Sequence, residues 1–154
     1  VHIVRGPDLT VLSFPGSGSS SYFGIIGAPT APSLFGIFPL NEKWAAEIGF
    51  DATNIRAPTT TIASFQLAPR ADMAVGDHWY AALGPQFHFV RGTGKLEGQT
   101  GLSVAWGYRF HLSGALDGRF EGSYGVNAKR RSDLGTGLPT SVFGLNFGAM
   151  MPLK

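Results

Sequence analysis

The hydrophobic and polar residues of this chain alternate with a period of two over most of its length. The clearest stretch is Trp44–Thr53, WAAEIGFDAT, where the apolar Ile48 and Phe50 are at even-numbered positions and the acidic Glu47 and Asp51 are at odd-numbered ones. Successive side chains of a strand point to opposite faces, whereas a helix would mix these two sets around its circumference. The pattern therefore predicts a strand with one apolar face and one polar face.

The remaining alternating segments predict an all-β chain, one domain over residues 1–154 with about eight strands of roughly 8–14 residues, long enough to cross a bilayer at a tilt. Residues 1–8 read as an irregular lead, and Leu9–Phe14 and Tyr22–Ile26 compete for the first strand. The other strands are predicted at Ser33–Leu40, Thr59–Val75, His78–Arg91, Thr100–Leu112, Ala115–Asn127 and Pro139–Leu153.

The connections between these strands differ in length. Short turns at Asn41–Lys43, Gly76-Asp77 and Ser113-Gly114 alternate with longer polar loops, as in outer-membrane barrels. Pro69 and Pro85 fall inside predicted strands, where a proline cannot donate to the ladder, so we expect a bulge at one or both.

Composition narrows the class of protein. Charged residues make up only 14% of the chain, below the usual quarter, and 22 residues are glycine. No apolar run approaches the ~18 residues of a membrane helix. The absence of cysteine excludes disulfides and thiolate metal sites, and a net charge of +2 is too small to indicate nucleic-acid binding. Val1–Gly6 has no apolar signal core, as expected of a mature chain whose signal peptide has been removed.

Several segments carry a resemblance to a known family. PLNEKWAAEIGF, HWYAALGPQFHFVRG, GLSVAWGYRFHL, GRFEGSYG and VFGLNFGAMMPL resemble the small, OmpA/OmpX-like outer-membrane β-barrel superfamily of bacterial surface proteins. The resemblance implies a closed antiparallel eight-stranded up-and-down transmembrane β-barrel and no single activity. One departure is the end of the chain, Met151–Lys154, because many such proteins end on an aromatic residue that the assembly machinery reads, and Phe147 is the nearest one here.

Seven charged residues are predicted on the inward face of such a barrel. Their signs nearly balance, which favours an internal salt-bridge network over an ion path, since isolated buried charges cost several kcal/mol. Glu47 is expected to reach Arg109 or Arg119 across the lumen, with Glu121 as a competing partner. The full set is Glu47, Arg70, Asp72, Arg109, Asp117, Arg119 and Glu121.

The histidines allow one enzymatic hypothesis. His88, Ser64 and Asp51 are predicted at similar heights on the inward face, and a Ser/His/acid set could hydrolyse an ester. The chain has no Gly-x-Ser-x-Gly elbow, so these are weak candidates and we expect no enzyme. Because His78, His88 and His111 fall at different predicted heights, no metal site and no cofactor are expected.

Aromatic residues are predicted to form two belts at the membrane interfaces. One belt holds Trp44, Trp79 and Phe110, and the other holds Phe50, Phe89, Tyr124 and Phe143. Lys129, Arg130 and Arg131 fall in an outer loop and could hold lipopolysaccharide phosphates.

The sequence thus favours an integral protein of the bacterial outer membrane with a filled polar interior and a structural or surface-interaction role through its external loops. Its expected partners are outer-membrane lipid, lipopolysaccharide and another envelope or surface protein, but not nucleic acid. Two alternatives are a hydrolase that modifies lipid or lipopolysaccharide, and a soluble lipocalin-like binder with the Trp44/Ile48/Phe50 face turned inward.

Overall fold

A computed structural model of the chain describes residues 2–5, 8–14, 18–24, 34–57, 60–91, 95–128 and 140–152. Within these residues there is no helix long and apolar enough to span a membrane. The strands are β1 (His2–Arg5), β2 (Asp8–Phe14), β3 (Gly18–Gly24), β4 (Leu34–Pro39), β5 (Trp44–Ala57), β6 (Thr60–Ala74), β7 (Trp79–Arg91), β8 (Leu96–Ser113), β9 (Leu116–Asn127) and β10 (Ser141–Pro152).

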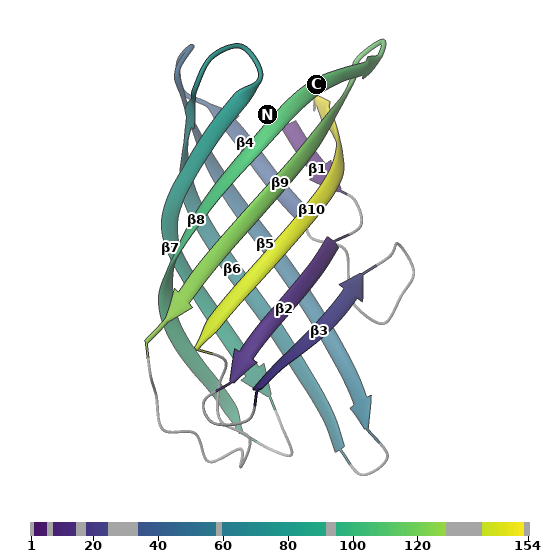
Figure 1. The fold of residues 1–154 in the computed structure, drawn as a ribbon, viewed down its shortest axis with the longest axis vertical. Helices are drawn as coiled ribbons and strands as arrows, with labels where there is room; N and C mark the ends of the chain where they lie inside the picture. The colour runs from purple at the N-terminus through teal and green to yellow at the C-terminus, as the bar shows by residue number, and fades with distance from the viewer. Residues whose placement is uncertain are drawn as a thin grey trace.

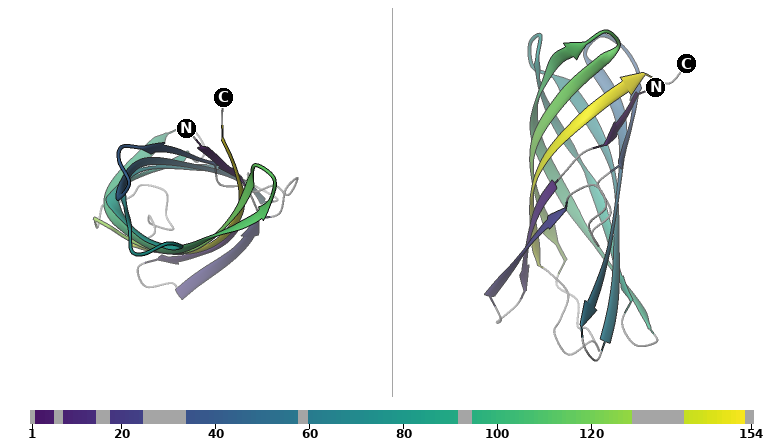
Figure 2. Two further views of the ribbon diagram at one scale, coloured as in Figure 1. Left: turned by 90° about the horizontal axis from the view of Figure 1, so that it is seen from above. Right: turned by 90° about the vertical axis from the view of Figure 1, so that its right-hand side faces the viewer.

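The strands form one closed antiparallel sheet (Figure 1). From β4 to β10 each strand pairs with the next along the chain, and β1 pairs with both β4 and β10. Seen from above, the strands run around a ring (Figure 2). The predicted eight-stranded up-and-down barrel is therefore confirmed.

The N-terminal strands depart from the prediction. His2 pairs with Pro152 and Asp8 with Asn146, so β1 and β2 follow β10 in one register as two parts of one strand. β2 also pairs with β3, so the two competing segments lie largely in neighbouring strands. The irregular lead over residues 1–8 is corrected by β1, whose four residues are too few for an alternation to be recognised.

The short turns lie together at one end of the barrel, which we call the turn end; the opposite end is the loop end. In the turn before β5, the Asn41 side chain accepts hydrogen bonds from the backbone N–H groups of Lys43 and Trp44, both at 2.9 Å. Gly76 and Gly114 take positive φ values of 91° and 57° in the other two turns. Such values suit glycine, which has no Cβ to clash.

Pro69 and Pro85 produce no bulge. The pairs Leu67↔Phe87 and Ala71↔Leu83 keep the same register on either side of them, which places the two prolines opposite each other in the β6–β7 ladder. Both missing N–H donors therefore fall at one place, and the strands need no extra residue to absorb them. The backbones approach closely here, since a Cβ on Gly84 would lie 2.0 Å from the carbonyl oxygen of Pro69.

The interior of the barrel is polar and its exterior is apolar. Arg119 and Gln86 point inward with 0% and 1% of their surface exposed, whereas Leu83 and Leu102 point outward with 57% and 63% exposed. The Trp44/Ile48/Phe50 face also points outward, at 43–47% exposure. This corrects the lipocalin-like alternative, which requires that face to line the cavity.

Candidate functional site

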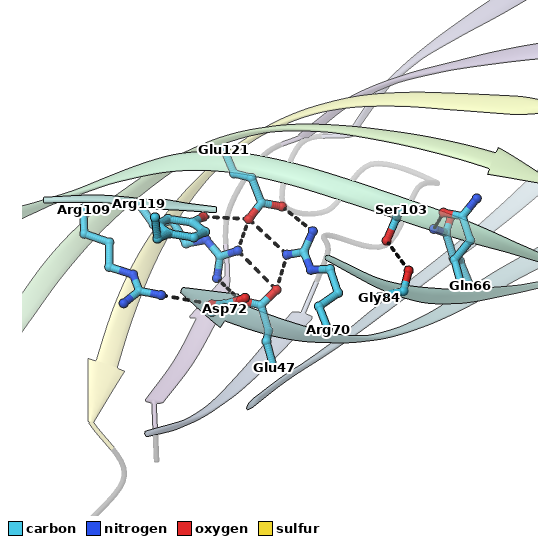
Figure 3. Close-up of polar contacts among 11 residues, drawn as sticks. Glu47, Gln66, Arg70, Asp72, Gly84, Ser103, Arg109, Arg119 and Glu121 are labelled. Carbon is cyan, nitrogen blue, oxygen red and sulfur yellow. Dashed lines mark hydrogen bonds and ion pairs between the residues drawn. The ribbon is translucent and has the colours of Figure 1, made fainter. Parts of the chain in front are cut away.

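Four charged side chains form a ring in the barrel lumen (Figure 3). Glu47 is bonded to both Arg70 and Arg119, and Glu121 is bonded to the same two guanidinium groups. Arg70 Nη1 lies 2.9 Å from Glu121 Oε1, and Arg119 Nη2 lies 3.2 Å from Glu47 Oε1. All four residues are buried, so two acids and two bases neutralise one another out of contact with solvent.

Strand register and strand curvature bring this ring together. Glu47 on β5 is directly paired with Arg70 on β6, and Arg119 and Glu121 lie two residues apart on the same face of β9. The strands β5 and β9 do not pair, so the Glu47–Arg119 contact crosses the lumen. A barrel of eight strands is narrow enough for long side chains to span it.

Tyr80 on β7 completes the centre of the cluster. Its hydroxyl donates a hydrogen bond to Glu121 Oε2 at 2.6 Å. The guanidinium carbons of Arg109 and Arg119 lie 4.4 and 4.8 Å from its ring centroid, within the range of a cation–π contact. Beside the ring and nearer the turn end, Arg109 Nη2 donates to Asp72 Oδ2 at 3.0 Å.

Phe35 on β4 contacts the same arginines from another side. The guanidinium carbon of Arg119 lies 4.8 Å from the Phe35 ring centroid, and that of Arg70 lies 5.3 Å from it. Sequence reasoning did not assign Tyr80 or Phe35 to the network, because an aromatic residue reads as apolar in an alternation pattern. Their positions in the alternation could have identified them, since each lies on the same strand face as residues that point into the lumen.

A second polar layer lies toward the loop end. Gln86 Nε2 donates to Asn127 Oδ1 at 2.6 Å, and Gln66 Nε2 donates to Gln86 Oε1 at 3.1 Å. Gln86 and Asn127 stand on β7 and β9 and meet across β8, where Gly101 is paired with both. This neutral chain of amide groups fills the lumen between the charged ring and the loop end.

The energetic role of the ring follows from its burial. A buried ion pair is favourable only when its geometry is good and its remaining hydrogen-bonding groups are satisfied. Arginine meets most of this need because its planar fork can serve two carboxylates at once, although the buried Nε atoms of Arg70 and Arg119 have no hydrogen-bond partner among the described residues. The ring therefore ties β5, β6 and β9 together across the lumen, and Tyr80 adds β7.

The predicted network residues divide into three groups. Glu47, Arg70, Arg119 and Glu121 meet in the ring, while Asp72 and Arg109 pair beside it. Asp117 does not join them: its carboxylate lies 3.0 Å from His111 Nδ1 in an exposed pair at the turn end. The alternative contact between Glu47 and Arg109 is replaced by the Asp72 pairing, because Arg109 lies closer to the turn end.

The weak catalytic candidates are only partly described. His88 is buried and its backbone pairs with Gln66, which pairs in turn with Asp51; Ser64 pairs with Val90, one step toward the loop end. The side chains of Asp51 and Ser64 lie outside what the structure describes. Among the described residues no three His, Cys, Asp or Glu side chains gather as a metal site.

The predicted belt residues point outward where the structure describes them. Trp44, Trp79, Phe50, Tyr124 and Phe143 are 40–48% exposed, and Phe89 and Phe110 are partly exposed. Near the turn end the rings form a connected series, measured between ring centroids. Trp79 lies 5.9 Å from Trp106 and 4.9 Å from Tyr108. Phe110 lies 6.2 Å from Tyr108 and 6.0 Å from Phe147. Nearer the loop end Phe89 stacks on Phe65 at 4.9 Å. Lys129, Arg130 and Arg131 lie outside the described residues.

Comparison with solved structures places the fold. The chain is similar to Neisserial surface protein A, with a TM-score of 0.67, 14% identity, and coverage of 99% of this chain and 96% of that one. It is also similar to Ail, the attachment invasion locus protein of Yersinia pestis (TM-score 0.56, 11% identity, 97% of each chain covered). The outer membrane protein OprG from Pseudomonas aeruginosa gives a TM-score of 0.54 at 13% identity, covering 99% of this chain and 96% of that one. No protein-family model and no curated protein sequence matches the chain.

Proposed function

We propose that this chain, which has the fold of the small outer-membrane β-barrels, is an integral outer-membrane protein that acts through its loop end and not as a general pore. The fold and the apolar exterior support the membrane location. In this orientation the turn end faces the periplasm and the loop end faces outward, since short turns are periplasmic in such barrels.

The observation that supports the proposal is the filled lumen. The ring of Glu47, Arg70, Arg119 and Glu121 joins opposite walls of the barrel, and the Gln66–Gln86–Asn127 amide chain occupies the lumen between the ring and the loop end. An eight-stranded barrel leaves an interior just wide enough for side chains to fill. We therefore expect no steady conductance when the purified protein is reconstituted in planar bilayers, and reproducible ion-selective channels would overturn the non-pore role.

The membrane location has its own test. The protein should fractionate with outer membranes and should migrate differently on gels before and after boiling, because a closed barrel resists detergent until it is heated. Recovery of the folded protein in the soluble fraction, with no shift on unboiled gels, would refute it.

The proposed surface role rests on cations near the loop end. Arg91 and Lys95 are exposed there, and the sequence places Lys129, Arg130 and Arg131 in the β9–β10 connection. The neighbour Ail has been solved in complex with the heparin analogue sucrose octasulfate, at 12% identity to this chain and a TM-score of 0.56. We propose that the loop end of this chain binds anionic groups, the phosphates of lipopolysaccharide in the first instance.

This role can be tested with variants of the exposed cations. Exchanging Lys129, Arg130 and Arg131 together for serine should weaken binding to lipopolysaccharide immobilised on a surface, and raising the salt concentration should weaken it further. Lipopolysaccharide without phosphate groups is the matched ligand control. Equal binding of both ligands would contradict the proposal.

The proposal assigns no enzymatic activity to the chain. Purified protein incubated with phospholipid or lipopolysaccharide should release no fatty acid. Release that is lost in a His88→Ala variant would instead support the hydrolase alternative.

A further inference from the structure

An apolar furrow of about 920 Å³ runs across the outer wall of the barrel. Its volume lies within the ~300–1,000 Å³ typical of small-molecule sites. The furrow lies between two rows of paired outward residues. One row includes Trp44, Met73 and Trp106, and the other includes Leu83, Val104 and Tyr124. The floor between the two rows includes the small residues Ala82, Ala105 and Ser123.

The furrow has a direction relative to the barrel. It is bounded on the side of the turn end by one row of paired residues, from Trp44 to Met73, Ala81, Trp106 and then Gly122. Trp44 is the first residue of β5 at the turn end, whereas Gly122 is the seventh of the twelve residues of β9. The furrow therefore begins at the turn end and climbs to about half the height of the barrel.

A lysine lies at the turn end of this furrow. Lys43 directly precedes Trp44 and is exposed, and its backbone carbonyl accepts a hydrogen bond from the Ala74 N–H at 2.8 Å. The Asn41 side chain fixes the same turn through the N–H groups of Lys43 and Trp44. The turn that leads into Trp44 thus places Lys43, together with its exposed neighbour Glu42, at the turn end of the furrow.

We infer that this furrow binds one phospholipid of the periplasmic leaflet, with its phosphate at Lys43 and one acyl chain along the furrow. The hydrocarbon core of a bilayer is ~30 Å thick, so a chain of one leaflet reaches about 15 Å from the interface. Paired strands lie about 4.8 Å apart and tilt by about 40°, so a chain that follows the furrow to this depth crosses about five strand spacings, from Trp44 on β5 to Phe143 on β10. The site rests on the membrane location proposed above.

The physical reason for a fixed lipid is close contact on three sides. Lipid tails meet any barrel wall, but a smooth wall offers each methylene contacts on one side only. Each carbon–carbon contact contributes ~0.1–0.2 kcal/mol, so a chain that touches a floor and two walls gains by the number of its contacts. Small floor residues allow the close approach, as they do where helices pack in membranes. The charge of Lys43 then selects the end at which the phosphate lies.

The test is retention of lipid by the full chain. The protein is reconstituted in bilayers of phosphatidylglycerol and phosphatidylethanolamine, extracted in mild detergent, and analysed by native mass spectrometry. The wild-type protein should retain one phospholipid. Ala81→Leu, which adds a large side chain to the lining of the furrow, should reduce retention several-fold, whereas Ala149→Leu, an equal change at an exposed outward residue away from the furrow, should not.

The head-group end needs a separate pair of variants. Lys43→Gln should lower retention and Lys43→Arg should preserve it, because arginine keeps the charge beside the phosphate. Equal retention by the wild type, Ala81→Leu and Lys43→Gln overturns the site. So does the finding that the furrow holds a second copy of the chain or a lipopolysaccharide, seen as a dimer or a bound lipopolysaccharide that Ala81→Leu removes. Failure of the protein to enter bilayers at all would overturn the membrane location itself, which is a distinct result.

Discussion

The Tyr80 hydroxyl donates to Glu121 Oε2 at 2.6 Å although a whole strand, β8, separates the two residues. The residue between them on β8 is Gly107, which is paired with both. A Cβ at this position would lie 2.2 Å from the end of the Tyr80 ring. The bond therefore exists because the intervening position has no side chain.

Gly107→Ala should destabilise the barrel by about 1–3 kcal/mol, because the added methyl group must displace a packed side chain. Unfolding in urea, followed by the gel shift of the folded barrel in lipid vesicles, measures the change. Gly122→Ala is the matched control, since the nearest atom to its Cβ is 3.6 Å away. Tyr80→Leu should remove most of the difference between glycine and alanine at position 107, and a cost that stays the same would contradict the explanation.

Glu47→Ala should cost roughly 3–5 kcal/mol of unfolding free energy, because it leaves two buried arginines with one shared acid. Arg119→Met should recover part of this loss in the double variant, since one acid and one base then leave together. The measurement is a double-mutant cycle on the urea unfolding of the reconstituted barrel.

Arg109→Met supplies the control for that cycle. Arg109 is bonded to Asp72 and not to Glu47, so its coupling to Glu47→Ala should be much smaller than that of Arg119. Additive effects for both arginines would mean that water screens each charge separately and that the ring does not act as a unit.

Ile48→Arg should cost about 2–4 kcal/mol if the outward face meets the bilayer core. Ile48 is 47% exposed, so the same change in a water-exposed sheet would cost little. Leu112→Arg, at the turn end of β8, is the depth control and should cost about 0–1 kcal/mol. Spin labels at Ile48, Leu102 and Val104 should be open to oxygen and shielded from water-soluble quenchers; the reverse accessibility would refute the lipid-facing assignment.

Gln86→Leu should destabilise the barrel by about 1–3 kcal/mol, because it removes an amide that bonds to both Gln66 and Asn127 inside the lumen. Ser103→Ala is a suitable comparison, since its hydroxyl makes only a 3.4 Å contact with the Gly84 carbonyl. Chemical denaturation of the two variants in the same lipid distinguishes them, and equal stability would argue against the amide chain.

The period of two in the sequence predicted the strands from β4 onward because each has an apolar outer face and a polar inner face. The predicted strand started too late, at Thr100, whereas β8 begins at Leu96. Residues Leu96–Gln99 include Glu97 and Gly98, which are typical of a loop, yet these residues pair with β7. The period of two missed β1 because four residues hold too little of a pattern. Its strand comes from pairing with β4 and β10, which are distant in the sequence.

The sequence predicted which side chains of the site point into the lumen, but it did not predict which of them form ion pairs with one another. Alternation turns Glu47, Arg109 and Arg119 toward the lumen, but it does not say which acid each arginine meets. That choice depends on the stagger of β5 against β9, strands that never pair. The stagger is set by every hydrogen-bonded register in between, and none of these registers is encoded in either strand alone.

The arrangement of the ring bears on how such a barrel can assemble. Glu47 and Arg70 are neighbours across the β5–β6 hairpin, and Arg119 and Glu121 are neighbours along β9. Each half of the ring therefore carries no net charge before the other half arrives. The charges of the ring are therefore paired within each segment, whereas Asp72 on β6 meets its partner Arg109 only when β8 is in place. The cross-lumen bonds form only once the curling sheet has brought β9 opposite β5. If the chain inserts into a membrane as proposed, the four charges of the ring thus oppose insertion less than four isolated ions would.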